Sequence, residues 1–375
     1  MKKKTIKRAL ALTLALCMSA SLTACGGGND SGSGGGNPSY HIGYNTWGAG
    51  TATFDFMSDV TVAALEAYGA ASTRASDDHM ADKELQNIQN FISGQVDGII
   101  MQSTADPTLP KAAEECADAG IPFVLAVFTG DDADRAEVRE NNNYYLGAVN
   151  ADMYAEGYII GQAAIEDGHK TAVMVGGNVG DNHMEQRIAG FTQAFATEGG
   201  GTILDSARCS SPAEGQEKSN ALLSANRDAD CLFAMVGDYV PGAVNAMETL
   251  GLEIPVYVTN ANTDAIGYIR SGKIAAATTG NDLVCAVAAA LMINYLDGHQ
   301  ILDADGKAPE LKSVGFRIDA DNVDDYEKLF LNNMPFTDEV LQTLVYRCNE
   351  DVTYDTFVDF VENHLNLKAL IADNK

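Results

Sequence analysis

Residues 96–101, Val-Asp-Gly-Ile-Ile-Met, begin the stretch of sequence that decides the fold. This short apolar run predicts a buried strand, and a helical pattern follows it over 111–119. Gly-Ile-Pro at 120–122 then ends the helix and opens a second apolar strand over 123–127. A strand, a helix and a strand in this order predict one unit of a parallel sheet with a helical crossover.

The chain repeats this unit in its second half. The second copy begins with a strand over 229–234 and continues with a helix and another strand. Asp97 precedes Pro122 by 25 residues, and Asp230 precedes Pro255 by 25 residues. A further strand and helix stand before each copy. Apolar strands that alternate with helices are typical of parallel sheets covered on both faces, so the repeat predicts an α/β protein with two doubly wound lobes.

The chain is expected to pass three times between these lobes. Asp152 marks the first passage and Gly280 the second, and a strand over 314–318 makes the third. We expect these crossings to form a hinge. Apolar residues at helical spacing in the tail predict that it packs on a core. The expected N-terminal lobe comprises 40–150 and 281–313, and the expected C-terminal lobe comprises 151–280 and 314–375.

Polar residues at the carboxyl ends of the strands are the expected ligand contacts. Ligands of open α/β sheets bind beyond these strand ends, so two facing lobes predict a ligand buried between them. A ligand that contacts both lobes would favour the closed state over the open one.

The N-terminus indicates export. Five basic residues within 2–8 precede an apolar run over 9–20 that is too short to span a bilayer, so 1–24 is expected to be a signal peptide. The Leu-Thr-Ala-Cys quartet at 22–25 resembles the lipobox of bacterial lipoproteins, which implies that Cys25 carries the lipid. The Gly- and Ser-rich segment 25–39 is expected to be a flexible tether. The mature protein would be extracytoplasmic and anchored to the cell membrane.

Charge and cysteine content exclude several classes of partner. The formal net charge is -28, and loss of the five basic residues of the signal leaves about -33, which disfavours nucleic acid. The cysteines beyond Cys25 are scattered and form no Cys-x-x-Cys pair, which argues against a structural zinc or an iron–sulfur cluster. No metal and no other cofactor is expected. Outside the cell Cys209 and Cys231 could form a disulfide.

Over about 40–318 the chain resembles the periplasmic binding proteins of the ribose and galactose type, the solute receptors of sugar ABC importers. The segments that carry the resemblance are 42–45, 96–100, 119–122, 187–191, 237–238 and 272–276. It implies a monomeric solute-binding protein that captures a small polar ligand, a sugar or a nucleoside-like molecule, and delivers it to the permease of an ABC importer. No catalysis is expected.

The resemblance also implies ligand contacts. Arg187 stands where relatives use an arginine to reach sugar hydroxyls, and Arg187→Ala is therefore expected to weaken binding while hardly changing stability. Asp238 corresponds to a cleft carboxylate, and Asn260 follows the next strand. Asn45 and Gln102 stand at strand ends of the first lobe.

Aromatic residues and a hinge asparagine complete the expected site. Trp47, the only tryptophan, follows the first strand, and its ring suits the C–H face of a sugar or a heterocycle. Phe54 continues that loop, Phe128 replaces a charged pair found in ribose-binding relatives, and Asn281 lies at the second passage. The loop at 180–183 also departs from the sugar pattern, so the particular ligand stays open.

Three other functions are compatible with parts of this pattern. A sensor of the same fold would present its closed state to a membrane kinase or a chemoreceptor, and the sequence does not separate it from a transport receptor. An exported enzyme would need a catalytic motif, and the chain has no Gly-x-Ser-x-Gly or His-Glu-x-x-His. A regulator of the lac-repressor type would have a DNA-binding headpiece where this chain has an export signal.

Overall fold

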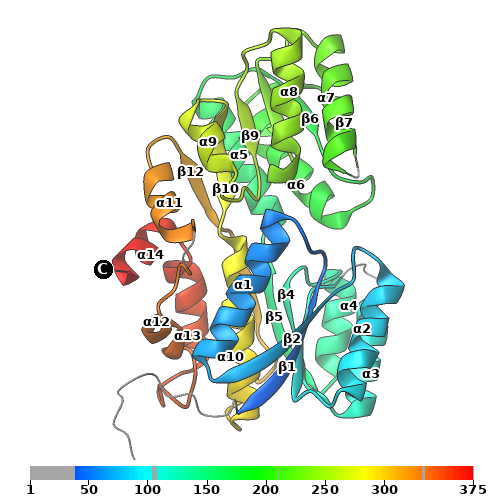
Figure 1. Cartoon of the computed structure of the whole chain (residues 1–375), viewed down its shortest axis with the longest axis vertical. Coiled ribbons are helices and arrows are strands. Elements are labelled where there is room, and N and C mark those ends of the chain that lie inside the picture. The colour runs from blue at the N-terminus through cyan, green and yellow to red at the C-terminus, as the bar shows by residue number, and fades with distance from the viewer. Residues whose placement is uncertain (1–38, 104–107, 210, 332–333, 375) are drawn as a thin grey trace, which may run out of the picture. The chain divides into compact units, whose positions relative to one another are not determined.

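Two six-stranded sheets, each flanked by helices, make up the part of the chain that the computed structural model describes, residues 39–103, 108–209, 211–331 and 334–374 (Figure 1). The first sheet has the strand order β11-β5-β4-β3-β1-β2, and all its strand pairs are parallel. Its strands are β1 (Tyr40–Thr46), β2 (Ala70–Ser76), β3 (Gly98–Met101), β4 (Phe123–Val127), β5 (Tyr145–Ala151) and β11 (Glu310–Ser313). Its helices are α1 (Ala52–Ala67), α2 (Ala81–Ser93), α3 (Thr108–Ala119), α4 (Asp132–Asn141) and α10 (Val284–Leu296).

The second sheet repeats the arrangement, with the order β12-β10-β9-β8-β6-β7. Its strands are β6 (Thr171–Val175), β7 (Thr202–Ala207), β8 (Cys231–Ala234), β9 (Val256–Val258), β10 (Ile274–Thr279) and β12 (Phe316–Asp319). Its helices are α5 (Met153–Glu166), α6 (Asn182–Thr192), the π-helix η1 (Gln193–Glu198), α7 (Pro212–Ala225), the 3-10 helix η2 (Gly237–Tyr239), α8 (Val240–Leu250) and α9 (Ala265–Arg270). The predicted fold of two doubly wound lobes is confirmed.

One strand of the second sheet is antiparallel. β12 runs against β10, and Phe316 at its start pairs with Thr279 at the end of β10. The chain arrives from β11 after only two residues, so it enters the second sheet at the carboxyl end of β10. From there β12 can pair along β10 only by running in the opposite direction.

The duplicated aspartates have the same structural role in both lobes. Asp97 Oδ2 accepts a hydrogen bond from the His41 amide at 2.7 Å, and Asp230 Oδ2 accepts one from the Lys170 amide at 2.8 Å. Each carboxylate fixes the start of the central strand next to it. His169, Asp230 and Cys231 offer potential metal-ligand atoms that lie within 4.8 Å of one another. Asp97 makes the same contact as Asp230 although it is not part of that cluster, so the contact needs no ion.

The chain crosses between the lobes from β5 to α5, from β10 through the 3-10 helix η3 (Asn281–Leu283) to α10, and from β11 to β12. Gly280 and Gly315 lie on the last two of these crossings with φ of 86° and 65°, values that a side chain rarely adopts. A Cβ on Gly315 would lie 2.6 Å from the carbonyl oxygen of Thr279, so the two crossings touch. The expected three-crossing hinge is confirmed.

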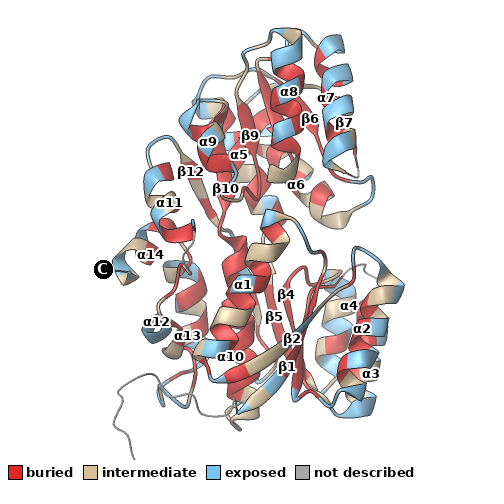
Figure 2. Cartoon of the chain, in the orientation of Figure 1, coloured by how far each residue is buried: buried red, intermediate tan, exposed pale blue. Residues whose placement is uncertain are grey.

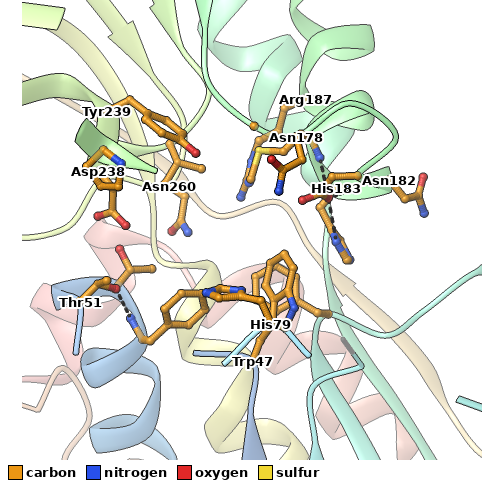
Figure 3. Close-up of a pocket in the computed structure, with 18 of the residues that line it drawn as sticks. Trp47, Thr51, His79, Asn178, Asn182, His183, Arg187, Asp238, Tyr239 and Asn260 are labelled. Carbon is orange, nitrogen blue, oxygen red and sulfur yellow. Dashed lines mark hydrogen bonds and ion pairs between the residues drawn. The ribbon is translucent and has the colours of Figure 1, made fainter. Parts of the chain in front are cut away.

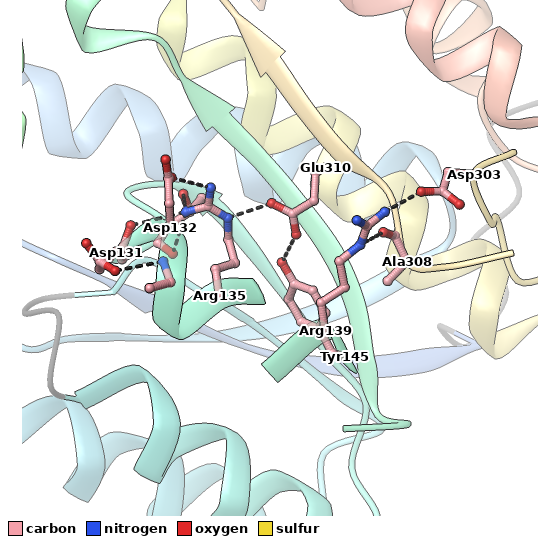
Figure 4. A network of polar contacts seen from close by, with 11 residues as sticks. Asp131, Asp132, Arg135, Arg139, Tyr145, Asp303, Ala308 and Glu310 are labelled. Carbon is pink, nitrogen blue, oxygen red and sulfur yellow. Dashed lines mark hydrogen bonds and ion pairs between the residues drawn. The ribbon is translucent and has the colours of Figure 1, made fainter. Parts of the chain in front are cut away.

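The edge strand β11 is tied to the first lobe by a polar network (Figure 4). Glu310 accepts hydrogen bonds from Arg135 Nε and from the Tyr145 hydroxyl, both at 2.5 Å. Arg139 pairs with Asp303 and donates to the Ala308 carbonyl at 2.7 Å. These contacts join α4 to β11 and to the loop before it.

The tail consists of α11 (Val323–Phe330), α12 (Asp338–Gln342), α13 (Tyr354–Asp359), the π-helix η4 (Phe360–His364) and α14 (Leu367–Asp373). The expected assignment of all of 314–375 to the C-terminal lobe is wrong for its middle part. α11 packs against α9 of the second lobe, but α12 packs against α1 and η4 against β11, both in the first lobe. The buried Leu344, Val345 and Phe357 explain this, because the apolar faces of α1 and α10 need a cover (Figure 2).

The expected signal peptide, the lipidated Cys25 and most of the tether fall within 1–38, outside the described residues. The five cysteines in the described part, including Cys209 and Cys231, are free thiols, so the disulfide left open by the sequence is absent there. Among the described residues, each helix is too short or too polar to cross a bilayer.

Candidate functional site

A pocket of about 640 Å³ lies between the lobes, at the carboxyl ends of both sheets (Figure 3). The first lobe contributes the loop after β1, the start of α1 and the ends of β2 and β4. The second lobe contributes the loop between β6 and α6, together with the ends of β8 and β9. This is the position where open α/β sheets bind ligands.

Aromatic rings form the first-lobe side of the pocket. The Trp47 ring lies 6.1 Å from Phe54, 5.1 Å from His79 and 4.4 Å from Phe128, measured between centroids, and all three contacts are edge-to-face. Trp47 Nε1 is buried and has no hydrogen-bond partner among the described residues. This aromatic wall, the first-lobe side of the pocket, is therefore apolar and has one unpartnered donor, the Trp47 N–H. Such a surface suits a ring that carries a hydroxyl or carbonyl at its edge.

Backbone strain accompanies these side chains. His79, Val127 and Asn260 have φ of 63°, 64° and 47°, and each stands at or just beyond the carboxyl end of a strand. Positive φ is rare outside glycine, and it is a genuine outlier for a β-branched residue such as Val127. Strained backbone of this kind persists where the surroundings enforce it, commonly at binding sites. Here it positions the rings of His79 and Phe128.

Arg187 is the main cation of the second-lobe side. It is 1% exposed, and its Nε donates to Glu156 Oε2 at 2.8 Å. Glu156 lies on α5, which packs closely against α6. A Cβ on Gly157 of α5 would lie only 2.0 Å from the carbonyl oxygen of Arg187 on α6. Arg187 Nη2 has no partner among the described residues, and the side chain lines the pocket. One guanidinium nitrogen is thus available to a ligand.

Asp238 and Asn260 line the pocket next to each other in the second lobe (Figure 3). Burial, followed by the charge of Asp264, raises the pKa of Asp238 above its usual value. Asn260 Oδ1 is buried and has no partner among the described residues. Both groups can exchange hydrogen bonds with ligand hydroxyls.

His183 of the second lobe contacts the aromatic wall of the first lobe. Its ring centroid lies 4.7 Å from that of Phe128 and 5.6 Å from that of Trp47. Asp181 caps α6 by accepting from the His183 amide at 3.0 Å. Burial alone would raise the pKa of Asp181, but its hydrogen bonds and its attraction to His183 lower it overall, so the carboxylate is charged near neutral pH.

The structure brings together six of the nine predicted ligand residues. Trp47, Phe54, Phe128, Arg187, Asp238 and Asn260 line the pocket, whereas Asn45, Gln102 and Asn281 do not. Asn45 donates to Asp77 and accepts from Asn87, both at 2.9 Å, and Asn281 donates to Glu156. Gln102 Oε1 accepts from the Trp47 amide at 2.9 Å, so it positions a pocket residue from behind.

Sequence reasoning missed several lining residues. His79 follows β2, an edge strand that carries no apolar run, and the polar cluster Ser-Asp-Asp-His at 76–79 was its available signal. His183 and Asp181 lie in the loop that departs from the sugar pattern, and that departure was the signal for them.

Residues 42–300 match the family described as periplasmic binding protein domain. The chain belongs to this family. The curated protein Catabolite control protein A of Priestia megaterium is 26% identical over 186 residues, which are 48% of this chain and 52% of that protein. The match spans about half the length of that relative.

Solved structures share the fold at low sequence identity. The arabinose-binding component of an ABC transporter from Shewanella sp. ANA-3, bound to L-arabinofuranose, has a TM-score of 0.67 and 21% identity, over 77% of this chain and 95% of that one. A solute-binding protein from Bacillus halodurans C-125 with bound myo-inositol has a TM-score of 0.66 and 18% identity. The match covers 79% of this chain and 99% of that one. The expected resemblance to sugar-type periplasmic binding proteins is confirmed.

Proposed function

We propose that this protein is an extracytoplasmic solute-binding lipoprotein that captures a small uncharged polar ligand, a sugar, and delivers it to an ABC importer. The observation that carries the proposal is a set of unpartnered polar atoms on residues that line the interlobe pocket. Trp47 Nε1, Arg187 Nη2 and Asn260 Oδ1 are buried and have no hydrogen-bond partner among the described residues. Buried polar atoms are nearly always paired, so two donors and an acceptor fit the hydroxyls of a bound ligand.

The charges that line the pocket favour an uncharged ligand. Among the described residues that line the pocket, Arg187 is the only lysine or arginine, and Glu156 balances its charge. Asp181 and Asp238 line the same pocket. A phosphate or a carboxylate would meet these acids without a free cation to offset them, so a sugar phosphate or an acidic amino acid fits poorly.

The similar structures support the ligand class. Their names give bound L-arabinofuranose in one protein and myo-inositol in another, and both ligands are neutral polyols. Recognition by binding, with no catalytic step, is part of the proposal for this chain.

The ligand class can be tested by thermal denaturation in the presence of arabinose, ribose, galactose, myo-inositol and glucose 6-phosphate. A ligand that binds only the folded state adds about 2.7 kcal/mol of stability at a hundredfold excess over Kd, so a neutral binder should raise the Tm by several degrees. Glucose 6-phosphate should not. Trp47→Phe keeps a ring but removes the donor, and it should weaken binding about tenfold. Tyr158→Phe, on exposed α5 surface, is the matched control. A panel in which only the anion stabilises the protein would reject the proposal.

Membrane anchoring through Cys25 needs its own test. Cys25→Ser should leave ligand binding unchanged but release the protein from the membrane fraction, because removal of the thiol removes the acylation site. Unchanged retention of the variant in the membrane would argue against the lipid anchor.

A further inference from the structure

A second cavity of about 300 Å³ adjoins the pocket. The two cavities share Thr51, Pro212 and Asp238, so they lie side by side between the lobes. Figure 3 shows Thr51 and Asp238 facing each other where the cavities meet. The start of α1 forms one wall of the second cavity, and the starts of α8 and α9 form the other.

The second cavity has the same kind of lining as the first. Tyr268 supplies an aromatic ring, and Pro241 and Ala265 supply apolar surface. Asn262 and Asp264 supply an amide and a carboxylate. A flat apolar surface with a few polar groups at its edge is what a sugar ring requires, so each cavity can accept one ring.

The volume of the two cavities does not arise because the lobes are held apart. On one side of the pocket the His183 ring lies 4.7 Å from Phe128, and on the other side Asn262 Nδ2 donates to Thr53 Oγ1 at 3.3 Å. The lobes therefore already touch on both sides, yet cavities of about 640 and 300 Å³ stay between them. Pockets of roughly 300–1,000 Å³ bury drug-sized ligands, and a single sugar ring is smaller than those.

Asp238 lies at the junction of the two cavities. Within the described residues its carboxylate accepts one hydrogen bond, from Asn262 Nδ2 at 3.5 Å. A carboxylate has about four acceptor positions, so Asp238 has capacity for hydroxyls on either side.

We propose that the ligand of this cleft is a neutral glycoside with two rings, which lie against Trp47 in the pocket and against Tyr268 in the second cavity, with Asp238 between them. The inference rests on the proposed function and extends it from a single sugar to a larger one.

The test compares cellobiose, maltose, lactose and adenosine with glucose, galactose and ribose by titration calorimetry. At least one two-ring probe should bind about tenfold more tightly than its component sugar, or more. Ala52→Trp fills the second cavity from an exposed position that does not line the pocket, and Tyr268→Ala removes the second ring contact. Each should reduce that advantage to about threefold or less and leave single-sugar binding unchanged. Ala133→Trp, an exposed first-turn substitution in α4, is the matched control.

The possible outcomes separate the inference from the function. A single sugar that binds wild type as tightly as every two-ring probe overturns the inference while the solute-binding function stands. An advantage that survives both Ala52→Trp and Tyr268→Ala also overturns it. If no probe of either size binds, the proposed function fails and the inference falls with it.

Discussion

Arg187 lines the pocket, and its Nε donates to Glu156, while its buried Nη2 has no partner among the described residues. Because Arg187 is buried in an ion pair and does not lie on the surface, the structure argues against the expectation that Arg187→Ala would hardly change stability. Glu156 is fully buried, and removal of Arg187 would leave its charge uncompensated. Breaking a buried ion pair from one side typically costs about 3–5 kcal/mol, whereas replacing both partners by apolar residues is often neutral.

Arg187→Ala should accordingly lower the unfolding free energy by about 3–5 kcal/mol without ligand, measured by urea denaturation. The double variant Glu156→Leu/Arg187→Met should recover most of that loss but still bind ligand weakly. Arg208→Ala, which breaks a more exposed pair with Glu185, serves as control and should cost within about 1 kcal/mol. A loss for Arg187→Ala as small as that of the control would mean that Glu156 is not held as a charged partner.

Asp282 lies on the second crossing, and we expect it to make the stability of the fold depend on pH. The residue is 4% exposed, and burial, followed by the charge of Glu156, raises the pKa of its carboxyl to about 7. Between about pH 4, where the unfolded chain loses the proton, and pH 7 the folded protein holds a proton that the unfolded chain does not. Stability from this group is therefore complete at acid pH and is lost as the pH rises through this window.

Asp282→Asn should remove this loss, because an amide does not ionise. The variant should raise the Tm relative to wild type more at pH 8 than at pH 4.5, by the equivalent of a few kcal/mol. Asp321→Asn, on the exposed surface, should change the Tm equally at both pH values. Equal shifts for Asp282→Asn at the two pH values would show that its carboxyl ionises normally in the fold.

At the residue scale the sequence predicted which positions follow strands but not which way their side chains turn. Trp47 and Asn45 come from the same strand end, yet Trp47 lines the pocket while Asn45 is used by Asp77 and Asn87. Those partners come from the end of β2 and from α2, neither of which the local pattern around Asn45 reveals.

At the scale of elements, Asn294 of α10 holds the tail onto the first lobe. Its Nδ2 donates to the Leu344 carbonyl at 2.8 Å, and its Oδ1 accepts from the Tyr346 amide at 2.7 Å. Asn294→Ala leaves both backbone groups without this partner and should cost at least about 2 kcal/mol. Hydrogen exchange should accelerate over 341–365 in the variant.

The control for that variant is Asn349→Ala, whose side chain bonds only locally: Nδ2 donates to the Thr343 carbonyl at 2.8 Å, and Oδ1 accepts from the Asp351 amide at 3.2 Å. It should change stability by less than about 1 kcal/mol. Exchange that accelerates throughout α10 and β5 as well would show that Asn294 supports the whole lobe and not the tail in particular.

The elements with clear local patterns were predicted well. β4 has the predicted bounds, because a short continuous apolar run identifies a strand that is buried on both faces. β2 was not predicted, since it is an edge strand whose residues 70–76 alternate small and polar types. The tail was predicted to pack on a core, but its middle part was assigned to the wrong lobe, because apolar spacing shows that a helix packs and not where it packs.

At the scale of the molecule, a ligand that satisfies Trp47 in one lobe and Arg187 in the other should stabilise the closed arrangement. Small-angle scattering should give a smaller radius of gyration with a sugar that raises the Tm than without it. Trp47→Ala at the same sugar concentration should show no such change. A stabilising sugar that leaves the radius of gyration of wild type unaltered would contradict hinge closure.

The placement of the tail has a mechanical consequence. With α11 fastened to the second lobe and α12 to the first, this segment behaves as a strap anchored at both ends. A segment attached to both lobes does not hinder their approach, but it restrains their separation once it is fully extended. We therefore expect the tail to limit how far the two lobes can separate when no ligand is bound.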